Sequence, residues 1–430
     1  MDKKEAYKRI IADFFTRDLS HVLPRKYDIP LALPKVISLT GPRRAGKTFL
    51  LFELIKQLRE EGIPKERLVY VNFEDDRLFP IQLSDLDVLL QAYYEMYPDN
   101  KEKKVWFFFD EIQEVRHWEK FIRRVHDQEN CQLFVTGSSS KLLSREIASS
   151  LRGRTLSYEI LPLSFREFLD FNSISPDVNT SKGQALLNHW LTRYMQQGGF
   201  PELIFLPQEI HQPTIQEYLD LVLYRDITER FNIKNPALLK YLLKYLLNNI
   251  SNRLSYTKTY NDLRSRGFSV SKNTVLEYIS YLEEAFVLFQ VSVWNRSLRA
   301  QAINPRKVYA IDPAFRHAMS VSADKGRVME NLVFLELKRR GKQPFYYSNG
   351  REVDFFLEDE YLINVALSID EPNTFQRETE SLFSAMKQLN ISESSLITLY
   401  EKRTLRREGK TIHIQPLADF LLNTSPASKS

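Results

Sequence analysis

A glycine-rich stretch that ends in lysine and threonine is the segment of this chain best suited to chemistry. It reads Gly-Pro-Arg-Arg-Ala-Gly-Lys-Thr over residues 41–48 and fits the template G-x-x-x-x-G-K-[ST]. Gly41 and Gly46 allow the backbone to curl without Cβ clashes, so that its N–H groups can point at a polyphosphate. Lys47 would then reach the β- and γ-phosphates, and the hydroxyl of Thr48 would ligate Mg²⁺. The stretch predicts a phosphate-binding loop; the simpler interpretation is a glycine turn before a helix.

The second chemical feature is a pair of acids at the end of an apolar run. Residues 105–109 read Val-Trp-Phe-Phe-Phe, which indicates a strand buried on both faces, and Asp110 and Glu111 follow it directly. Ligands of open α/β sheets bind beyond the carboxyl ends of the strands. Asp110 would hold Mg²⁺ through its water shell, and Glu111 would polarise the attacking water. The alternative is a strand followed by a solvated acidic turn.

A group of hydroxyls follows another apolar run. Residues 136–140 read Thr-Gly-Ser-Ser-Ser, directly after the apolar residues 133–135. A hydroxyl at this strand end, such as that of Ser138, would bond the γ-phosphate or the attacking water. A serine-rich turn without chemistry is the alternative.

These three features require a sheet that brings the ends of several strands together. Further strands are expected at 36–40, 68–71, 132–136 and 155–161, and apolar residues at helical spacing lie between them. Residues 49–58 are expected as the helix that leaves the phosphate loop, with its N-terminus adding positive potential. Alternation of strand and helix predicts an α/β fold with a parallel, doubly wound sheet.

Composition describes an ordinary globular protein of 430 residues, for which two to four domains are expected. A single cysteine, Cys131, excludes a disulfide framework and a cysteine zinc site. No apolar run approaches the roughly 18 residues of a membrane span, and residues 1–5 lack the apolar core of a signal peptide, so a cytoplasmic protein without a membrane partner is expected. Residues 251–307 hold nine Lys and Arg against four Asp and Glu, a surplus equal to the net charge of +5 of the whole chain. This local basic surface is a weak nucleic-acid signal.

The phosphate loop and the two polar strand ends resemble those of the AAA+ ATPase superfamily. A closer resemblance is to a bacterial and archaeal group of predicted ATPases with a C-terminal domain of unknown function, and it extends over roughly residues 1–420. The stretches that it rests on are Gly-Pro-Arg-Arg-x-Gly-Lys-Thr at 41–48, Asp-Glu-Ile-Gln at 110–113, Gly-Ser-Ser-Ser at 137–140, Leu-Arg-Gly-Arg at 151–154, Leu-Pro-Leu-Ser-Phe-Arg-Glu-Phe-Leu at 161–169 and Gly-Gly-Phe-Pro-Glu at 198–202.

The resemblance implies ATP as the nucleotide and Mg²⁺ as the metal ion. It implies a nucleotide contact for every residue of the loop and for the residue after it: Gly41, Pro42, Arg43, Arg44, Ala45, Gly46, Lys47, Thr48 and Phe49. Magnesium binding is then expected from Thr48 and Asp110, and hydrolysis from Glu111.

The same resemblance implies two further roles in hydrolysis. One of Thr136, Ser138 and Ser139 would be the sensor of the γ-phosphate. An arginine finger, which reaches the γ-phosphate of a neighbouring subunit, is expected at Arg154 or, as the second choice, at Arg152. A basic turn or a salt bridge is the alternative for these arginines. The chain is expected to form a homo-oligomer, or a monomer with weak self-association.

The middle of the chain predicts a winged helix. Residues 236–311 follow the plan helix, helix, turn, helix and strand hairpin, which is that of a winged helix. Lys272 and Asn273 would lie on the outer face of its recognition helix, and Arg296 and Arg299 at the tip of the hairpin. Contact with DNA is one expectation, and packing against protein alone is the other.

Residues 312–422 resemble the restriction-endonuclease-like nuclease core, in which a helix acid, a strand Asp and a Glu-x-Lys pair gather Mg²⁺ and activate water. Glu330 and Asp354 match the first two positions. Asn364 and Ala366 stand where the motif needs Glu and Lys. Because one carboxylate is thus an amide and the ammonium is a methyl group, we expect this domain to lack nuclease activity and to bind DNA or a partner.

Six segments are therefore expected: an N-terminal helical segment (1–34), the ATPase core (35–161), a helical lid over the nucleotide (162–235), the winged helix (236–311), the degenerate nuclease-like domain (312–422) and a disordered tail (423–430). The leading hypothesis is a Mg²⁺-dependent AAA+ type ATPase that couples hydrolysis to a conformational change and acts on DNA or a protein partner. A slow nucleotide switch without significant turnover is the alternative, and an active DNA nuclease is the third hypothesis. The residues alone do not distinguish ATP from GTP.

Overall fold

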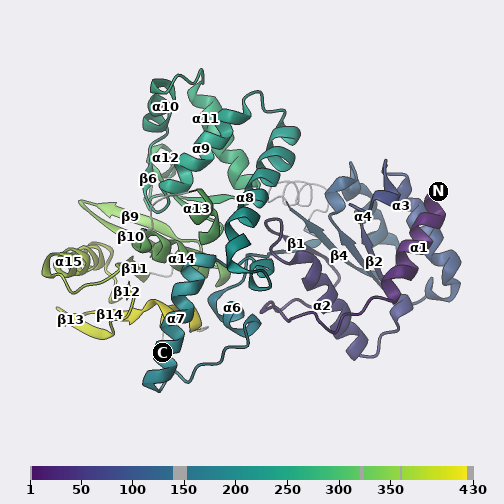
Figure 1. Ribbon diagram of the computed structural model, residues 1–430, viewed down its shortest axis with the longest axis horizontal. Helices are drawn as coiled ribbons and strands as arrows, with labels where there is room; N and C mark the ends of the chain where they lie inside the picture. The colour runs from purple at the N-terminus through teal and green to yellow at the C-terminus, as the bar shows by residue number, and fades with distance from the viewer. Residues whose placement is uncertain (1, 139–152, 320–323, 359–360, 424–430) are drawn as a thin grey trace. The chain divides into compact units, whose positions relative to one another are not determined.

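The computed structural model describes residues 2–138, 153–319, 324–358 and 361–423, and it divides into two compact units (Figure 1). The N-terminal unit runs from Met1 to Ile160 and the C-terminal unit from Leu161 to Ser430. Among the described residues, no helix combines the length and the apolar content needed to cross a bilayer.

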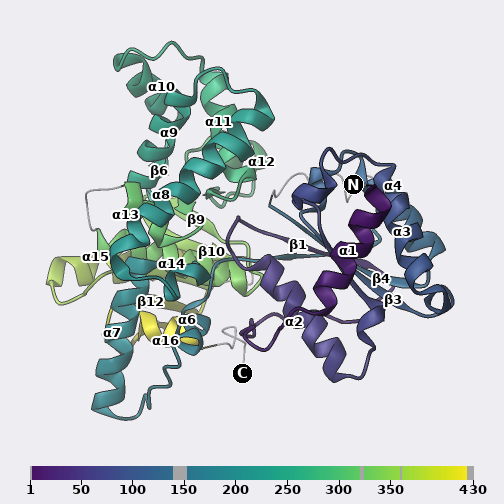
Figure 2. The same cartoon turned by 45° about the vertical axis from the view of Figure 1, so that its right-hand side comes forward.

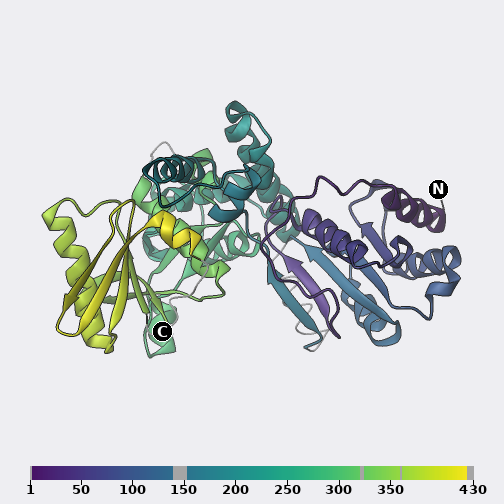
Figure 3. The ribbon, with the colours of Figure 1, turned by 90° about the horizontal axis from the view of Figure 1, so that it is seen from below.

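A five-stranded parallel sheet forms the centre of the N-terminal unit (Figure 3). Its strands are β1 (Val36–Thr40), β2 (Leu68–Asn72), β3 (Val105–Asp110), β4 (Cys131–Gly137) and β5 (Thr155–Glu159). They lie in the order β2-β3-β4-β1-β5, and every neighbouring pair is parallel. The expected α/β fold with a parallel, doubly wound sheet is confirmed.

Helices cover both faces of this sheet because its strands are apolar on both sides. The helices are α1 (Lys3–Phe15), α2 (Lys47–Glu60), α3 (Asp85–Met96) and α4 (Trp118–Gln128), with short 3-10 turns η1 (Lys65–Arg67), η2 (Asp76–Leu78), η3 (Pro98–Asn100) and η4 (Ile112–Glu114). Phe107 and Phe109 of β3 join a core with α1, α3 and α4, whereas Trp106 and Phe108 join a core with α2. α1 and α3 lie side by side on their face (Figure 2).

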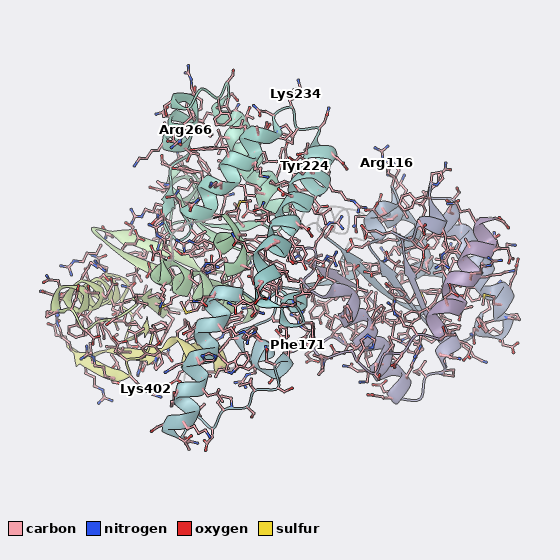
Figure 4. All side chains as sticks on the ribbon, viewed as in Figure 1. Arg116, Phe171, Tyr224, Lys234, Arg266 and Lys402 are labelled. Atoms are coloured by element: carbon pink, nitrogen blue, oxygen red, sulfur yellow. The ribbon has the colours of Figure 1, made fainter. Side chains whose placement is uncertain are left out.

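The C-terminal unit begins with helices. They are α6 (Phe165–Phe171), α7 (Ser181–Gln197), α8 (His211–Leu221), the π-helix η7 (Val222–Glu229) and α9 (Pro236–Asn248), with 3-10 turns η5 (Pro201–Ile204) and η6 (Gln208–Ile210). α6 starts at a capping box formed by Ser164 and Glu167. The π-helix continues α8 directly, and its Tyr224 is half exposed (Figure 4). All six leucines of α9 are buried, as their helical spacing predicts.

Two helices and a small antiparallel sheet follow. The helices are α10 (Tyr256–Ser265) and α11 (Lys272–Glu284), and the strands are β6 (Arg253–Leu254), β7 (Leu288–Val291) and β8 (Arg306–Ala310), in the order β6-β8-β7. Ser271 caps α11 by accepting the N–H of Thr274 at 3.0 Å, as its sequence predicts. The loop between β7 and β8 contains a short helix, α12 (Leu298–Ile303), where the sequence indicates only a hairpin tip. This helical turn forms because Ser297 accepts the N–H of Ala300.

A six-stranded mixed sheet completes the C-terminal unit (Figure 3). Its strands are β9 (Phe345–Asn349), β10 (Arg351–Leu357), β11 (Tyr361–Val365), β12 (Glu393–Thr398), β13 (Arg403–Arg407) and β14 (Lys410–Pro416), in the order β13-β14-β12-β11-β10-β9. Its helices are α13 (Pro313–Met319), α14 (Lys325–Arg339), α15 (Pro372–Leu389) and α16 (Leu417–Leu422). β9 and β10 form a hairpin because Gly350, with a φ of +77°, reverses the chain between them.

Candidate nucleotide-binding site

The glycine-rich loop connects the end of β1 to the start of α2, and its glycines are required by the backbone. An added Cβ at Gly41 would lie 2.1 Å from the carbonyl oxygen of Ile160, so that only glycine fits there. Gly46 has a φ of +93°, in the left-handed region that glycine favours, and Arg44 has a φ of +64°. The loop therefore has the tight curl that the sequence predicts.

The side chain of Lys47 lies inside this curl. It is 4% exposed, and its Nζ donates to the carbonyl oxygens of Gly41 at 3.1 Å and Pro42 at 3.0 Å. The same Nζ lies 3.8 Å from Oε1 of Glu111. The ammonium group thus stands between the loop and the acid that follows β3.

Asp110 is the polar centre of the site. Its Oδ2 accepts hydrogen bonds from the hydroxyls of Thr48 at 2.7 Å and Tyr70 at 2.8 Å, and its Oδ1 accepts one from the hydroxyl of Thr136. Because β2, β3 and β4 are neighbours in the sheet, side chains from three strands meet the first turn of α2 at this carboxylate. Thr48 and Asp110, the two residues predicted to bind Mg²⁺, are therefore in direct contact.

Burial shapes the protonation of this cluster. Burial and the neighbouring charge of Glu111 raise the pKa of Asp110, while the three hydroxyl donors act in the opposite direction. Burial and the charge of Asp110 hold the pKa of Tyr70 well above its usual value, so that its hydroxyl remains a donor. A cation placed beside Asp110 would favour the ionised carboxylate.

Glu111 begins the turn after β3, and its backbone is held in an uncommon conformation. Its φ is +51°, and its N–H donates to the hydroxyl of Thr136 at 2.9 Å. Its Oε2 accepts a hydrogen bond from Nε2 of Gln113 at 2.5 Å, in the turn η4. The second acid of the pair therefore projects toward Lys47 rather than into solvent.

The groups present fit a magnesium nucleotide. A curled glycine loop and a buried ammonium suit a polyphosphate, and the paired hydroxyl and carboxylate of Thr48 and Asp110 supply the oxygen ligands that Mg²⁺ prefers. When bound, Mg²⁺ would neutralise negative charge on the phosphate oxygens. These residues would hold it directly or through water.

Other predicted residues have different surroundings. Arg43 forms an ion pair with Glu74 at 3.2 Å, and Phe49 is 51% exposed at the start of α2. Ser138 is buried in the turn after β4. Nε of Arg154 lies 3.1 Å from Oδ1 of Asp127, which is the salt bridge named as the alternative to an arginine finger. The roles expected for these residues stay predictions, and Arg152 and Ser139 lie outside the described residues.

Three residues of the site were missed by sequence reasoning. Tyr70 looks like an ordinary apolar strand residue in the sequence, and only the pairing of β2 with β3 brings it to Asp110. Gln113 lies in the Asp-Glu-Ile-Gln stretch, where its spacing of two residues from Glu111 was a usable signal. Arg25 is buried, and its guanidinium donates to the carbonyl oxygen of Ala45 at 2.7 Å, which supports the loop from outside.

A second polar cluster lies in the C-terminal unit. Nζ of Lys307, which is 1% exposed, lies 3.0 Å from Glu330, 2.8 Å from Glu352 and 2.8 Å from Asp354. The structure therefore brings together the two acids expected at a nuclease-like site. Next to them is a cavity of about 630 Å³ that is also lined by Asn364.

The four residues expected to contact DNA lie on the surface. Lys272 and Asn273 are exposed in the first turn of α11, and Arg296 and Arg299 are exposed in and before α12. The winged-helix assignment and the DNA contact stay predictions.

Comparison with known proteins agrees with this site. Residues 33–169 match the model of a family described as an AAA domain, and residues 188–325 match a domain of unknown function, DUF8612. The chain is 37% identical over 432 residues to the uncharacterized protein MJ1544 of Methanocaldococcus jannaschii, with 97% of this chain and 95% of that protein covered. It is 32% identical over 360 residues to an uncharacterized protein of Haemophilus influenzae, with 81% and 85% covered.

A comparison with solved structures finds a Walker-type ATPase of Pyrococcus abyssi, at 14% identity and a TM-score of 0.43 over 74% of this chain and 95% of that one. Another is the Orc1 protein of Aeropyrum pernix in complex with DNA, at 15% identity and a TM-score of 0.31 over 76% and 93%. The sequence relatives show that the chain belongs to the same family as the proteins of Methanocaldococcus jannaschii and Haemophilus influenzae, and the residues of the candidate site lie in the part of the chain that matches an AAA domain.

Proposed function

We propose that this protein is a Mg²⁺-dependent ATPase that couples hydrolysis to a conformational change and acts on DNA or a protein partner. The observation that supports it best is the convergence at the end of β3, where Asp110 accepts the hydroxyl of Thr48 at 2.7 Å and Glu111 lies 3.8 Å from Nζ of Lys47. The residues proposed to bind the phosphates, to hold the metal ion and to act as the general base are thus neighbours. The AAA domain match over residues 33–169 supports ATP as the nucleotide.

The residues of the site have separate tasks in this proposal. The loop N–H groups and Lys47 would neutralise the phosphate oxygens, and Thr48 and Asp110 would hold the metal ion. The oxygen of a water molecule bonds to the γ-phosphorus, one of its protons passes to the carboxylate of Glu111, and the bond from the γ-phosphorus to the bridging oxygen breaks. ADP and phosphate are the products.

Residues 162–422 are proposed to transmit the conformational change that ATP hydrolysis drives. The order β6-β8-β7 with α9, α10 and α11 supports a winged helix at 236–311. The exposed cations and amide at Lys272, Asn273, Arg296 and Arg299 support its contact with duplex DNA. A helical lid at 162–235 and a nuclease-like domain without activity at 312–422 complete the proposed arrangement.

Steady-state phosphate release tests this function, with and without duplex DNA. Lys47→Ala should lose ATP binding and turnover, whereas Glu111→Gln should bind ATP and hydrolyse it at least about a hundredfold more slowly than the wild type. Lys56→Ala, which changes a lysine on α2 away from the loop, is the matched control and should keep the wild-type rate. Equal rates of phosphate release in the wild type and the three variants would refute the mechanism.

The outcome also separates the alternative functions. Tight ATP binding with negligible turnover, even with DNA present, would replace the ATPase by a nucleotide switch. Divalent-dependent DNA cleavage that is lost in Asp354→Ala would show that the C-terminal domain is an active nuclease.

A further inference from the structure

The carboxylate of Glu111 has a different neighbour at each oxygen. Oε1 faces Nζ of Lys47 at 3.8 Å, and Oε2 accepts from Nε2 of Gln113 at 2.5 Å. The backbone of Glu111 is fixed independently, because its N–H is bound to Thr136 at 2.9 Å. The direction of the carboxylate beyond Cα is therefore set by these two side chains.

Only one of these two contacts is compatible with a bound polyphosphate. An ammonium that neutralises the β- and γ-phosphates turns its hydrogen bonds toward them, so Lys47 ceases to orient Glu111. Gln113 lies in η4, directly after Glu111, and its amide approaches from the side of the turn rather than from the loop. It is then the neighbour that can hold the carboxylate in a single direction during hydrolysis.

The other end of the same amide provides an independent observation. Oε1 of Gln113 is buried and accepts no hydrogen bond from any residue in the described part of the chain. Buried acceptors without a partner are rare in proteins because they lose their bonds to water, and each requires an explanation. This oxygen is also closed to solvent, so the amide is enclosed by its neighbours and its Nε2 keeps its direction toward the carboxylate of Glu111.

We propose that Gln113 is a positioning residue for hydrolysis, because its Nε2 fixes the direction of the carboxylate of Glu111. The inference rests on the proposed ATPase function and adds a specific residue to it. Gln113 contributes no proton in this role, since an amide neither gains nor loses one at neutral pH. Its effect is on geometry, where a displacement of about 1 Å can reduce the rate about a hundredfold.

The test compares Gln113→Ala and Gln113→Met with the wild type in the full chain. Methionine has a similar length and shape but no amide, so it reports on the hydrogen bonds if alanine disturbs folding. Both variants should reduce kcat for phosphate release by about ten- to a hundredfold. KM and the affinity for ATP should remain within about twofold of the wild type, because the hydrogen bond of Gln113 goes to Glu111 and not to the phosphate loop. Gln128→Ala, at the exposed end of α4, is the matched control and should leave kcat unchanged.

The possible results separate this inference from the ATPase proposal. A wild type without phosphate release refutes the ATPase function itself. An active wild type whose kcat is unchanged in both variants overturns the role of Gln113 and leaves the ATPase intact. A loss of ATP affinity parallel to the loss of kcat also overturns it, since a positioning role affects turnover and not binding.

Discussion

Asp312 is a fully buried carboxyl group whose protonation depends on the fold. Its Oδ2 accepts the N–H of Gly199 at 2.8 Å, and its Oδ1 accepts the N–H of Ala314 at 2.8 Å. Burial raises the pKa of Asp312 to about 7, against the effect of these two donors and of Arg339. The carboxyl group is therefore largely protonated in mildly acidic solution, unlike a surface aspartate.

This shift predicts a pH dependence of stability in the C-terminal unit. Because the pKa in the folded state lies above that of the unfolded chain, the stabilising contribution is fully present below about pH 4 and is lost as the pH rises through about 7. Asp312→Asn removes this titration, so the difference in free energy of unfolding between variant and wild type should change by up to about 4 kcal/mol over that range. Urea unfolding at several pH values measures it, and parallel pH profiles of the two proteins would contradict the prediction.

At the scale of elements, the turn after α7 packs against the segment that follows β8. Gly198 ends α7 with a φ of +78°, and an added Cβ there would lie 1.8 Å from Oδ1 of Asp312. The carbonyl oxygen of Leu163 would lie 2.3 Å from a Cβ added at Gly199. The Gly-Gly pair in the sequence is therefore explained by close packing as well as by backbone conformation.

Gly198→Ala should destabilise the protein much more than the same substitution at a glycine that is required only for its backbone conformation. Gly267 is the matched control, since its φ is +86° and no atom lies within 4 Å of an added Cβ. Gly267→Ala should cost about 1 kcal/mol from backbone strain, and Gly198→Ala should cost several kcal/mol because the collision is added. Thermal or urea unfolding of both variants checks this, and equal losses would show that Asp312 moves aside without cost.

At the scale of the whole molecule, the ion cluster around the buried Lys307 joins parts of the C-terminal unit that are distant in sequence. Lys307 comes from β8 of the small sheet, Glu330 from α14, and Glu352 and Asp354 from β10 of the large sheet. Burial alone would lower the pKa of Lys307, but the charge of Asp354 and of the other acids outweighs it and raises the pKa. Burial, followed by the charge of Asp354, raises the pKa of Glu330 to about 8. A charged lysine is thus shared by acids of which one is largely protonated.

Lys307→Met should destabilise the C-terminal unit by about 3 kcal/mol, because it leaves three partly buried carboxylates without their cation. The double variant Lys307→Met with Asp354→Asn should recover part of that loss, since it removes one of the uncompensated charges. Lys240→Ala is the control: its pair with Asp220, at 2.9 Å, lies on the surface and should contribute about 1 kcal/mol or less. Urea unfolding of the three variants measures these differences. A loss for Lys307→Met as small as that of the surface pair would contradict this account of the cluster.

The sequence by itself determined the phosphate loop and the parallel sheet. It also determined the two strands that precede this loop and the acids Asp110 and Glu111. These features depend on local requirements: Gly41 and Gly46 meet the need of a curled backbone, and the apolar run before Asp110 requires a strand buried on both faces. The capping of α11 by Ser271 is local in the same sense. Such signals lie within a few residues of the structure that they specify.

Tertiary structure alone decided which side chains meet. Tyr70 reaches Asp110 because β2 and β3 are neighbours, and Lys307 reaches Glu330 because β8 packs beside α14. Neither pair has a sequence signature, since the contacts depend on strand order and on helix packing between segments that are far apart in the chain. The direction of Gln113 was likewise set by the turn after β3, where a positive φ at Glu111 turns the two side chains toward each other.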